Sequence, residues 1–405
     1  MNNQEKLGFN IILLGLVSLI TDASSEIIIP LIPFFLKFLG GAAIGVGLII
    51  GIVGGLRDSL SSILKGASGY WSDKINRKKP FVVAGYSISA GSKLFFPLAE
   101  TWEQVTIINV IERAGKGIRN APRDAIIAES SEKKKGKGFG IHRAMDSAGA
   151  IIGSFFAFIF ILIFHPETGV EKLDVMRWIF LGAAIIAFFA LIPLMYVKEK
   201  SQRAPLKYKI GFKRLPREYY FVLCIMGLFA FGNFTNLFSI IYVGSCFPPE
   251  LELLIPLILY IWFNVVYTIF SIPVGNLADK YGKGKILSFG YGFFSLTCLI
   301  FIFSRSLLPF ILAFAIYGIS YAFIDAVQRA YIADLVPTEV RGTALGTFHM
   351  VIGLAALPAG ILAGILYDLD PTHTSTFLYG MIIGLISVIF LVIYIKTYKP
   401  LAYNL

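Results

Sequence analysis

Charged residues are scarce in this sequence. Only 15% of its 405 residues are Asp, Glu, Lys or Arg, whereas 56% are hydrophobic and 15% are aromatic. A soluble globular domain typically has about 25% charged and roughly 45–50% apolar residues. The shortage of charge therefore excludes an ordinary soluble protein and indicates a membrane protein that crosses the bilayer several times.

Residues that often perform catalysis or bind metals are also few. The chain has three cysteines and four histidines, and no metal-type spacing or Ser–His or Cys–His pattern is visible among them. The segment GKGIRN lacks the spacing of a nucleotide-binding P-loop. We therefore expect no enzyme and no bound metal or cofactor. The cysteines, which we interpret as packing residues, are Cys224, Cys246 and Cys298.

Twelve apolar runs are each long enough for a membrane-spanning helix, which needs about 20 residues. They divide evenly around the longest polar stretch, so we predict an all-α membrane protein with two six-helix bundles. The predicted bundles are residues 1–197 and 217–405, and residues 198–216 form a cytoplasmic linker. The predicted spans are 8–37, 43–70, 80–98, 104–129, 137–164, 175–197, 217–246, 252–278, 284–304, 308–334, 342–367 and 375–397.

Lysine and arginine are unevenly distributed among the loops. The net charge of +11 alone would fit a nucleic-acid partner. However, 23 of the 36 Lys and Arg residues lie in even-numbered loops and at the two ends, and only four lie in odd-numbered loops. Cytoplasmic loops have such an excess of basic residues. We therefore predict cytoplasmic termini, a location in the cell membrane, and no nucleic-acid partner.

Three short segments of the first half of the chain recur in the second half. The corresponding segments are 69–79 and 275–285, 121–129 and 326–334, and 135–140 and 341–346, at offsets of 206, 205 and 206 residues. Nearly equal offsets indicate two repeats of the same topology, as in transporters built from duplicated bundles. We therefore expect a pseudo-two-fold relation between the two bundles.

The stretch ERAGKGIRNAPRDAIIAES at 112–130 is highly charged, but its counterpart in the second half is apolar. We therefore predict that it is the fourth span and not a loop. On a helix its charges fall within an arc of about 140°. Charge at mid-membrane is costly, so this arc must face a water-filled cavity or paired charges. The residues on it are Glu112, Arg113, Lys116, Arg119, Arg123 and Asp124.

Other spans of the first half also contain ionisable residues, whereas those of the second half offer mostly neutral polar side chains. The predicted substrate and ion-coupling residues are Asp22, Glu26, Arg57, Asp58, Glu112, Arg113, Lys116, Arg119, Asp146, Asn233, Asn236 and Asn264. A small basic excess favours an anionic or zwitterionic solute, and the buried acids are candidates for proton coupling. Lys93 is expected to extend outward to the membrane surface. The alternative is that buried Arg–Asp pairs only lock the helices together.

The segment GYWSDKINRKK resembles the loop signature of the major facilitator superfamily, which lies between the second and third spans. Its weaker copy at 275–285, RAGKG in the fourth span and the pattern of twelve spans are similar to that family as well. Lys116 stands where the family commonly has Gln. Gly149 and Gly153 resemble the glycines of antiporter members, although the usual proline is missing.

The resemblance implies a secondary active transporter that moves a small solute by alternating access, and the two glycines suggest export by antiport, with protons as the expected coupling ion because of the buried acids. It also implies a latch in which Asp73 faces the start of the eleventh span at 337–342, while Arg77 pairs with Asp124 or Glu129. The predicted latch residues are Gly69, Asp73, Arg77, Arg123, Asp124 and Asp279. We expect a monomer whose partners are the solute, protons and the lipid bilayer.

Two alternatives stay open. An exporter of divalent metals or cationic drugs with the same fold would use acids and imidazoles as ligands, although the basic arc of the fourth span disfavours a cation. The metal ligands would be Asp22, Glu26, His142, Asp146 and His349. The alternative from another class is a non-transporting membrane receptor, which we would expect to have an appended soluble domain.

Overall fold

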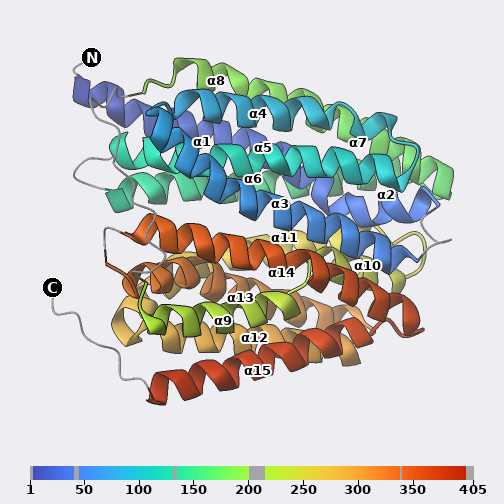
Figure 1. Cartoon of the computed structure of the whole chain (residues 1–405). Helices are drawn as coiled ribbons and strands as arrows, with labels where there is room; N and C mark the ends of the chain where they lie inside the picture. The colour runs from blue at the N-terminus through green and yellow to red at the C-terminus, as the bar shows by residue number, and fades with distance from the viewer. Residues whose placement is uncertain (1–2, 41–44, 131–134, 200–214, 338–339, 398–405) are drawn as a thin grey trace.

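The computed structural model describes residues 3–40, 45–130, 135–199, 215–337 and 340–397, and every regular element within them is a helix (Figure 1). The first half comprises α1 (Asn3–Ile28), η1 (Ile29–Leu31), α2 (Ile32–Phe38), α3 (Val46–Ile75), α4 (Lys79–Lys93), η3 (Phe96–Leu98), α5 (Trp102–Ser130), α6 (Lys135–Phe164), α7 (Gly169–Phe189) and α8 (Leu191–Tyr196). The second half comprises α9 (Arg217–Gly232), α10 (Leu237–Ser245), α11 (Leu254–Tyr281), α12 (Lys283–Phe303), α13 (Leu307–Asp334), α14 (Arg341–Leu369) and α15 (Ser375–Thr397).

Eleven helical segments of the described chain are long and apolar enough to cross a membrane. Their bounds follow the predicted spans closely, for example Phe9–Phe38 for the first span and Leu307–Asp334 for the tenth. The fourth predicted span forms the continuous helix α5, but its charged residues keep it outside this group. A helix is therefore present where we predicted one, and its crossing of the bilayer stays a prediction.

Two spans that we predicted as continuous are interrupted. The first changes to one turn of 3₁₀ helix at η1, where Pro30 has no N–H to donate. The seventh ends as α9 at Gly232 and restarts as α10 at Leu237, so residues 233–236 lie between two helices. Irregular backbone at membrane depth is tolerated only where it is buried in protein or lines a cavity. The helices before the two breaks end at Ile28 and Gly232, 204 residues apart, and the helices after them begin at Ile32 and Leu237, 205 residues apart, close to the offset of the repeat.

Helices α3 and α14 make the most extensive contact between the two halves. Glycines occupy the facing positions, so the backbones touch. A Cβ atom on Gly51 would lie 2.0 Å from the carbonyl oxygen of Gly360, and a Cβ atom on Gly364 would lie 2.4 Å from that of Gly47. Any larger residue would push the helices apart. We call these four residues the glycine seam.

The start of α1 and the end of α15 lie on the same side of the molecule, at the left of Figure 1. We call this side the terminal end, and the opposite side, where α2 ends and α3 begins, the far end. Figure 1 shows the first half above the second, and α6 packs against α11 between them. The predicted domain boundaries stay a prediction, because residues 200–214 of the linker lie outside the described residues.

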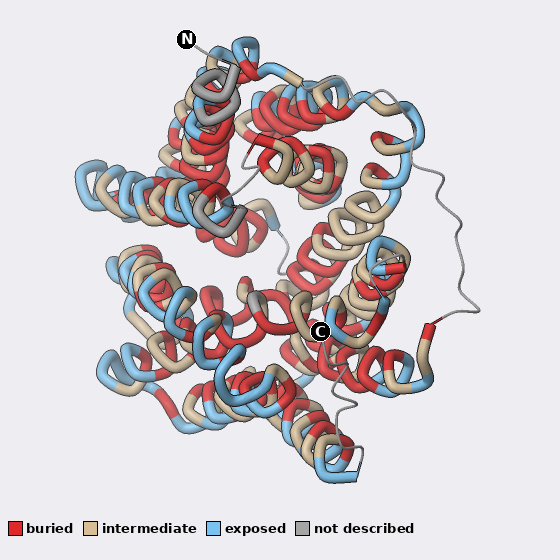
Figure 2. Tube along the Cα trace, turned by 90° about the vertical axis from the view of Figure 1, so that its left-hand side faces the viewer, coloured by how far each residue is buried: buried red, intermediate tan, exposed pale blue. Residues whose placement is uncertain are grey.

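Large apolar side chains cover the outer surface of the helices. Phe303, Leu308, Met195 and Ile272 are each more than 70% exposed. Viewed from the terminal end, exposed residues lie on the outward faces of the helices and many buried residues face the interior (Figure 2). A lipid bilayer accommodates such an extensive apolar surface, whereas its exposure to water would be unfavourable. The surface and the apolar helices together make this a multi-pass membrane protein.

Candidate functional site

A cavity of about 470 Å³ lies between the two halves. It is lined by α1, α3, α5 and α6 of the first half, and by the break at 233–236, α11, α13 and α14 of the second half. Small-molecule sites usually have volumes of about 300–1,000 Å³. The cavity is therefore large enough for a small solute.

Most residues of the predicted substrate and coupling site line this cavity. They are Asp22, Glu26, Arg57, Asp58, Arg113, Lys116, Asp146, Asn233, Asn236 and Asn264. Helical spacing explains part of this arrangement, because residues four apart on α1, such as Asp22 and Glu26, share one face. The remaining two predicted residues, Glu112 and Arg119, are buried outside the lining.

Glu112 belongs to a buried network between α1, α4 and α5. Ser89 and Ser25 donate hydrogen bonds to its Oε1 atom over 2.9 and 3.3 Å. Lys93 Nζ donates to the hydroxyl groups of Ser24 and Ser25, over 2.9 Å in each case. Lys93 is completely buried, so our expectation that it extends outward is wrong. Hydroxyl groups of α1 satisfy its ammonium group inside the bundle, and Ser25 joins it to the Glu112 carboxylate.

Arg119 is buried on the same helix and packs against α4. Its guanidinium lies 4.3 Å from the centre of the Tyr86 ring, which makes a cation–π contact. No protein group accepts a hydrogen bond from its Nε and Nη1 atoms within the described chain. The structure therefore places this predicted site residue between two helices of the first half.

Every carboxylate that lines the cavity has a partner in the protein. The paired groups are Asp22 with Lys116 (3.5 Å), Asp58 with Arg57 (3.3 Å), Asp146 with Ser18 (2.7 Å) and Arg143 (3.2 Å), Glu26 with Tyr260 (2.7 Å), and Asp325 with Arg329 (3.0 Å). Asp325 also meets Arg143 over 3.3 Å. The Glu26–Tyr260 and Arg143–Asp325 interactions join the first half to the second inside the cavity.

The second half contributes an aromatic wall, which we define as Tyr260, Phe263, Tyr267, Tyr317 and Tyr321. The Phe263 ring lies between 5.0 and 6.3 Å, centre to centre, from the other four rings. This wall was not predicted from the sequence. Its signal is present, because aromatic residues recur at intervals of three or four along α11 and α13, which is the spacing of one helix face.

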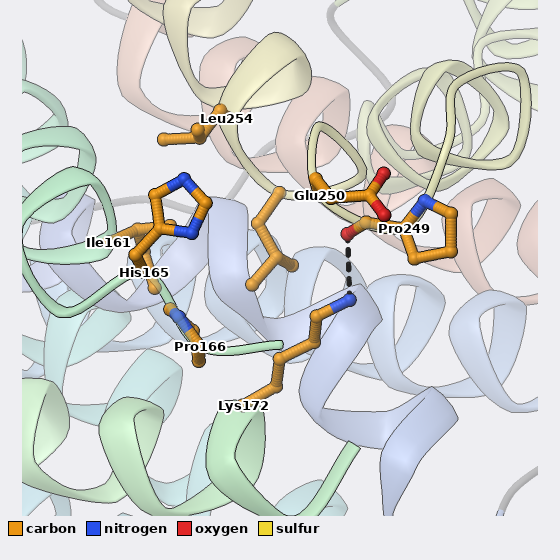
Figure 3. Close-up of a pocket in the computed structure, with 8 residues that line it drawn as sticks. Ile161, His165, Pro166, Lys172, Pro249, Glu250 and Leu254 are labelled. Carbon is orange, nitrogen blue, oxygen red and sulfur yellow. Dashed lines mark hydrogen bonds between the residues drawn. The ribbon is translucent and has the colours of Figure 1, made fainter. Parts of the chain in front are cut away.

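A group of charges at the far end was also not predicted from the sequence. Glu252 forms ion pairs with Lys37 and Lys172 of the first half, the latter over 3.1 Å. Lys172 also donates to the carbonyl oxygen of Pro249 over 2.8 Å (Figure 3). The small pocket at this place has only about 10 Å³, room for about one water molecule. We call Lys37, Lys172 and Glu252 the far-end clamp.

A second contact at the far end connects α14 to the start of α3. Asp368 accepts hydrogen bonds from the backbone amides of Gly47 and Leu48 over 2.8 and 2.7 Å. The first amides of a helix have no partner within the helix, and the helix dipole favours a negative charge there. Asp368 therefore attaches the second half to the first at this end.

The predicted latch lies at the terminal end. The start of the eleventh span includes residues 338–339, which lie outside the described residues, so the proposed contact of Asp73 stays a prediction. Gly69 allows α3 to approach α5, because a Cβ atom on it would lie 3.2 Å from the Cβ atom of Ala121. Asp279 lies on the exposed surface, 3.8 Å from Lys283.

Two acids that we proposed as partners of Arg77 have other basic neighbours. Arg123 Nη2 lies 2.9 Å from Asp124 Oδ1, and Lys78 forms an ion pair with Glu129. Arg77 itself is exposed. The structure thus gives both acids partners that the family resemblance did not indicate.

The acids and histidines of the metal alternative do not form a metal site in the part of the chain that the structure describes. Asp22, Glu26, Asp146 and His349 all line the cavity. No three His, Cys, Asp or Glu side chains among the described residues gather closely enough to hold a metal ion.

Comparison with known proteins gives matches over the whole chain. The sequence model of the Major Facilitator Superfamily matches residues 14–257 and 229–404. An MFS-type transporter of Methanocaldococcus jannaschii is 42% identical over 390 residues, which cover 95% of this chain and 94% of that protein.

Solved structures share the fold. A variant of the nucleoside transporter NupG has a TM-score of 0.76 at 15% identity, covering 96% of this chain and 100% of that chain. A D-xylose–proton symporter has a TM-score of 0.75 at 14% identity, covering 94% of this chain and 96% of that chain. At these identities the two structures show a common fold alone.

Proposed function

The chain belongs to the Major Facilitator Superfamily, and we propose that it is a secondary active transporter for a small anionic or zwitterionic solute. The observation that supports this proposal is the cavity of about 470 Å³, which charged residues of the first half and polar residues of the second half line together. Residues 1–197 and 217–405 would rock about the cavity and expose it to one side at a time. The termini would lie in the cytoplasm, and the far end outside the cell membrane.

Proton coupling is proposed for Asp22 and Glu26. Both line the cavity, and Glu26 also accepts a hydrogen bond from Tyr260 of the other half. A hydrogen bond to a carboxylate is roughly twice as strong as one between neutral groups. Protonation of Glu26 would therefore weaken a contact between the halves and favour their separation at the far end.

Export by proton antiport is proposed from the glycines that resemble those of antiporters. A Cβ atom on Gly149 or Gly153 of α6 would lie 2.3 or 2.1 Å from a carbonyl oxygen of α1. The backbones of α1 and α6 therefore touch beside Asp22 and Asp146. This close packing supports a coupled movement of α6 with α1, the helix that holds the proposed proton site.

Labelling from both sides tests alternating access without knowledge of the solute. Ser62 in the cavity wall is replaced by cysteine in a chain without its own cysteines, and a membrane-impermeant maleimide is added to reconstituted vesicles from either side. We expect labelling from both sides, with far-end labelling increasing as the pH falls. Labelling from one side at every pH would contradict alternating access.

The same assay tests the proton site. Glu26→Gln should weaken the pH dependence of far-end labelling, because one of the two proposed proton-binding side chains no longer takes up a proton. Asp174→Asn is the matched control, since this acid is exposed on α7 and pairs only with the nearby Arg177 among the ion pairs of the described chain. An unchanged pH profile in Glu26→Gln would overturn the proposed coupling role.

A further inference from the structure

Three buried polar atoms of residues that line the cavity have no hydrogen-bond partner in the described chain; one is the acceptor Oδ1 of Asn120, and the other two are guanidinium nitrogens. All five carboxylates in its wall already accept from protein groups. In contrast, Nη1 of Arg57 is buried without an acceptor in the described chain. Nε of Arg113 also makes no hydrogen bond with protein, although it lies 3.2 Å from Glu112. A buried donor without a partner costs free energy, so this site is prepared for an acceptor that comes from outside the protein.

Arg57 and Arg113 are suited to hold one anionic group. Both are more than nine-tenths buried and both line the cavity. Arg57 lies on α3 and Arg113 on α5, two helices that pack against each other. A planar guanidinium binds a carboxylate through two parallel hydrogen bonds, and burial strengthens such bonds.

The opposite side of the cavity is suited to a planar ring. All five side chains of the aromatic wall line the cavity. Rings on α11 are nearly parallel, with interplanar angles of 17° for Tyr260–Phe263 and 10° for Phe263–Tyr267, whereas Tyr321 stands at 71° to Phe263. A further ring can pack against such a surface in offset or edge-to-face geometry.

The two recognition surfaces line the same cavity. Arg57 and the aromatic-wall residues Tyr260 and Tyr321 are all in its lining, and Glu26, which also lines it, accepts a hydrogen bond from Tyr260. One small molecule can therefore contact both surfaces at once. The charged surface comes from α3 and α5 of the first half and the aromatic one from α11 and α13 of the second, so such a molecule would join the two halves.

We propose that the solute is a planar, ring-bearing organic anion. Its negative group lies between Arg57 and Arg113, and its ring lies against the aromatic wall. This assignment rests on the proposed transport function and specifies the chemical class of its substrate. A saturated anion loses the ring contacts, and an aromatic cation places a positive charge beside two buried arginines.

Equilibrium dialysis of radiolabelled naphthoate against the purified full-length protein tests the assignment. We expect saturable binding, with decahydronaphthoate competing about fivefold more weakly because it lacks the aromatic face. Naphthylmethylammonium, which keeps the ring and reverses the charge, should not compete. Absence of naphthoate binding, equal competition by the saturated anion, or competition by the cation would each overturn the assignment.

Variants locate the bound molecule. Phe263→Leu should weaken naphthoate binding about fivefold, because a ring contact is lost, whereas Phe270→Leu on the exposed side of the same helix should have no effect. Arg57→Gln should abolish the binding that wild type shows, and Arg57→Lys should restore part of it. Equal binding in Phe263→Leu and Phe270→Leu would overturn the ring site.

The binding and labelling experiments distinguish a wrong substrate class from a wrong transport function, because labelling of Ser62→Cys from both sides needs no solute. If naphthoate does not bind while labelling from both sides persists, the substrate class is wrong and the transport function stands. If labelling occurs from one side only, the transport function itself is wrong.

Discussion

At the scale of single residues, the buried Lys93 shows how the first half accommodates charge. Its ammonium group lies among hydroxyl groups of α1, and Ser25 connects it to Glu112. An ion buried without compensation would be very costly. The network therefore depends on both charges, and neither contacts the cavity directly.

Lys93→Met should destabilise the protein by about 3 kcal/mol, because it leaves Glu112 buried beside Arg113 without its second cation. The midpoint of thermal unfolding in detergent measures this effect. Lys65→Met is the matched control, since Lys65 lines the cavity and does not belong to the network. Equal midpoints for the two variants would show that the network contributes no stability.

The residue scale also shows what the sequence could predict about the site. The charges of α5 share a face by helical geometry, and two of them, Arg113 and Lys116, line the cavity. The orientation of Lys93 was not predictable in this way, because it depends on hydroxyl groups that another helix supplies. The aromatic wall around Phe263 was predictable from the spacing of its residues. It has no charged side chain, whereas the predicted site consists of charged and amide side chains.

At the scale of helices, the glycine seam determines how closely α3 and α14 approach. Gly51→Ala places a methyl group 2.0 Å from the carbonyl oxygen of Gly360, so the helices must separate locally at a cost of about 1–3 kcal/mol. We expect increased far-end labelling of Ser62→Cys. Gly66→Ala is the control on the same helix, because its methyl group would lie 3.7 Å from the nearest atom. Equal labelling in both variants would contradict this role of Gly51.

Helix positions were largely predictable, whereas helix interruptions were not. Apolar runs of sufficient length defined the ends of most helices to within a few residues. The break at 233–236 was missed because hydropathy averages over a whole span and does not register a local change. The proline at the first break, Pro30, and the asparagines at the second, Asn233 and Asn236, are the local signals for irregular backbone.

At the scale of the whole molecule, the far-end clamp connects halves that are separated by a long stretch of sequence. Glu252→Gln removes the carboxylate that Lys37 and Lys172 share. Two lysines would then lie beside a neutral amide, which should shift the population toward states open at the far end by about tenfold or more. Far-end labelling of Ser62→Cys measures the shift.

Glu250→Gln is the matched control for this clamp prediction. Glu250 lies two residues away in the same loop and is exposed, so it tests the effect of removing one negative charge from this end. We expect no change in labelling. If Glu250→Gln and Glu252→Gln gave the same result, the effect would arise from net charge and not from the clamp.

Contacts between the halves could not be predicted from the sequence. The repeat indicates that the halves resemble each other, but it contains no information on how they meet. Asp368 illustrates the difficulty, because its partners are backbone amides of Gly47 and Leu48, which every residue type except proline would provide. The cavity likewise exists only because two distant parts of the chain face each other.

The glycine seam has a mechanical consequence. Interlocking side chains resist sliding, because each must change rotamer before a neighbouring helix can pass. Gly51 and Gly360 present smooth backbone to each other, so α3 and α14 can roll without such rearrangements. The seam would thus keep α3 and α14 in contact while allowing the angle between the two halves to change. The energy barrier of the conformational change would then arise mainly at the ion pairs between the halves, which must break before the halves can separate.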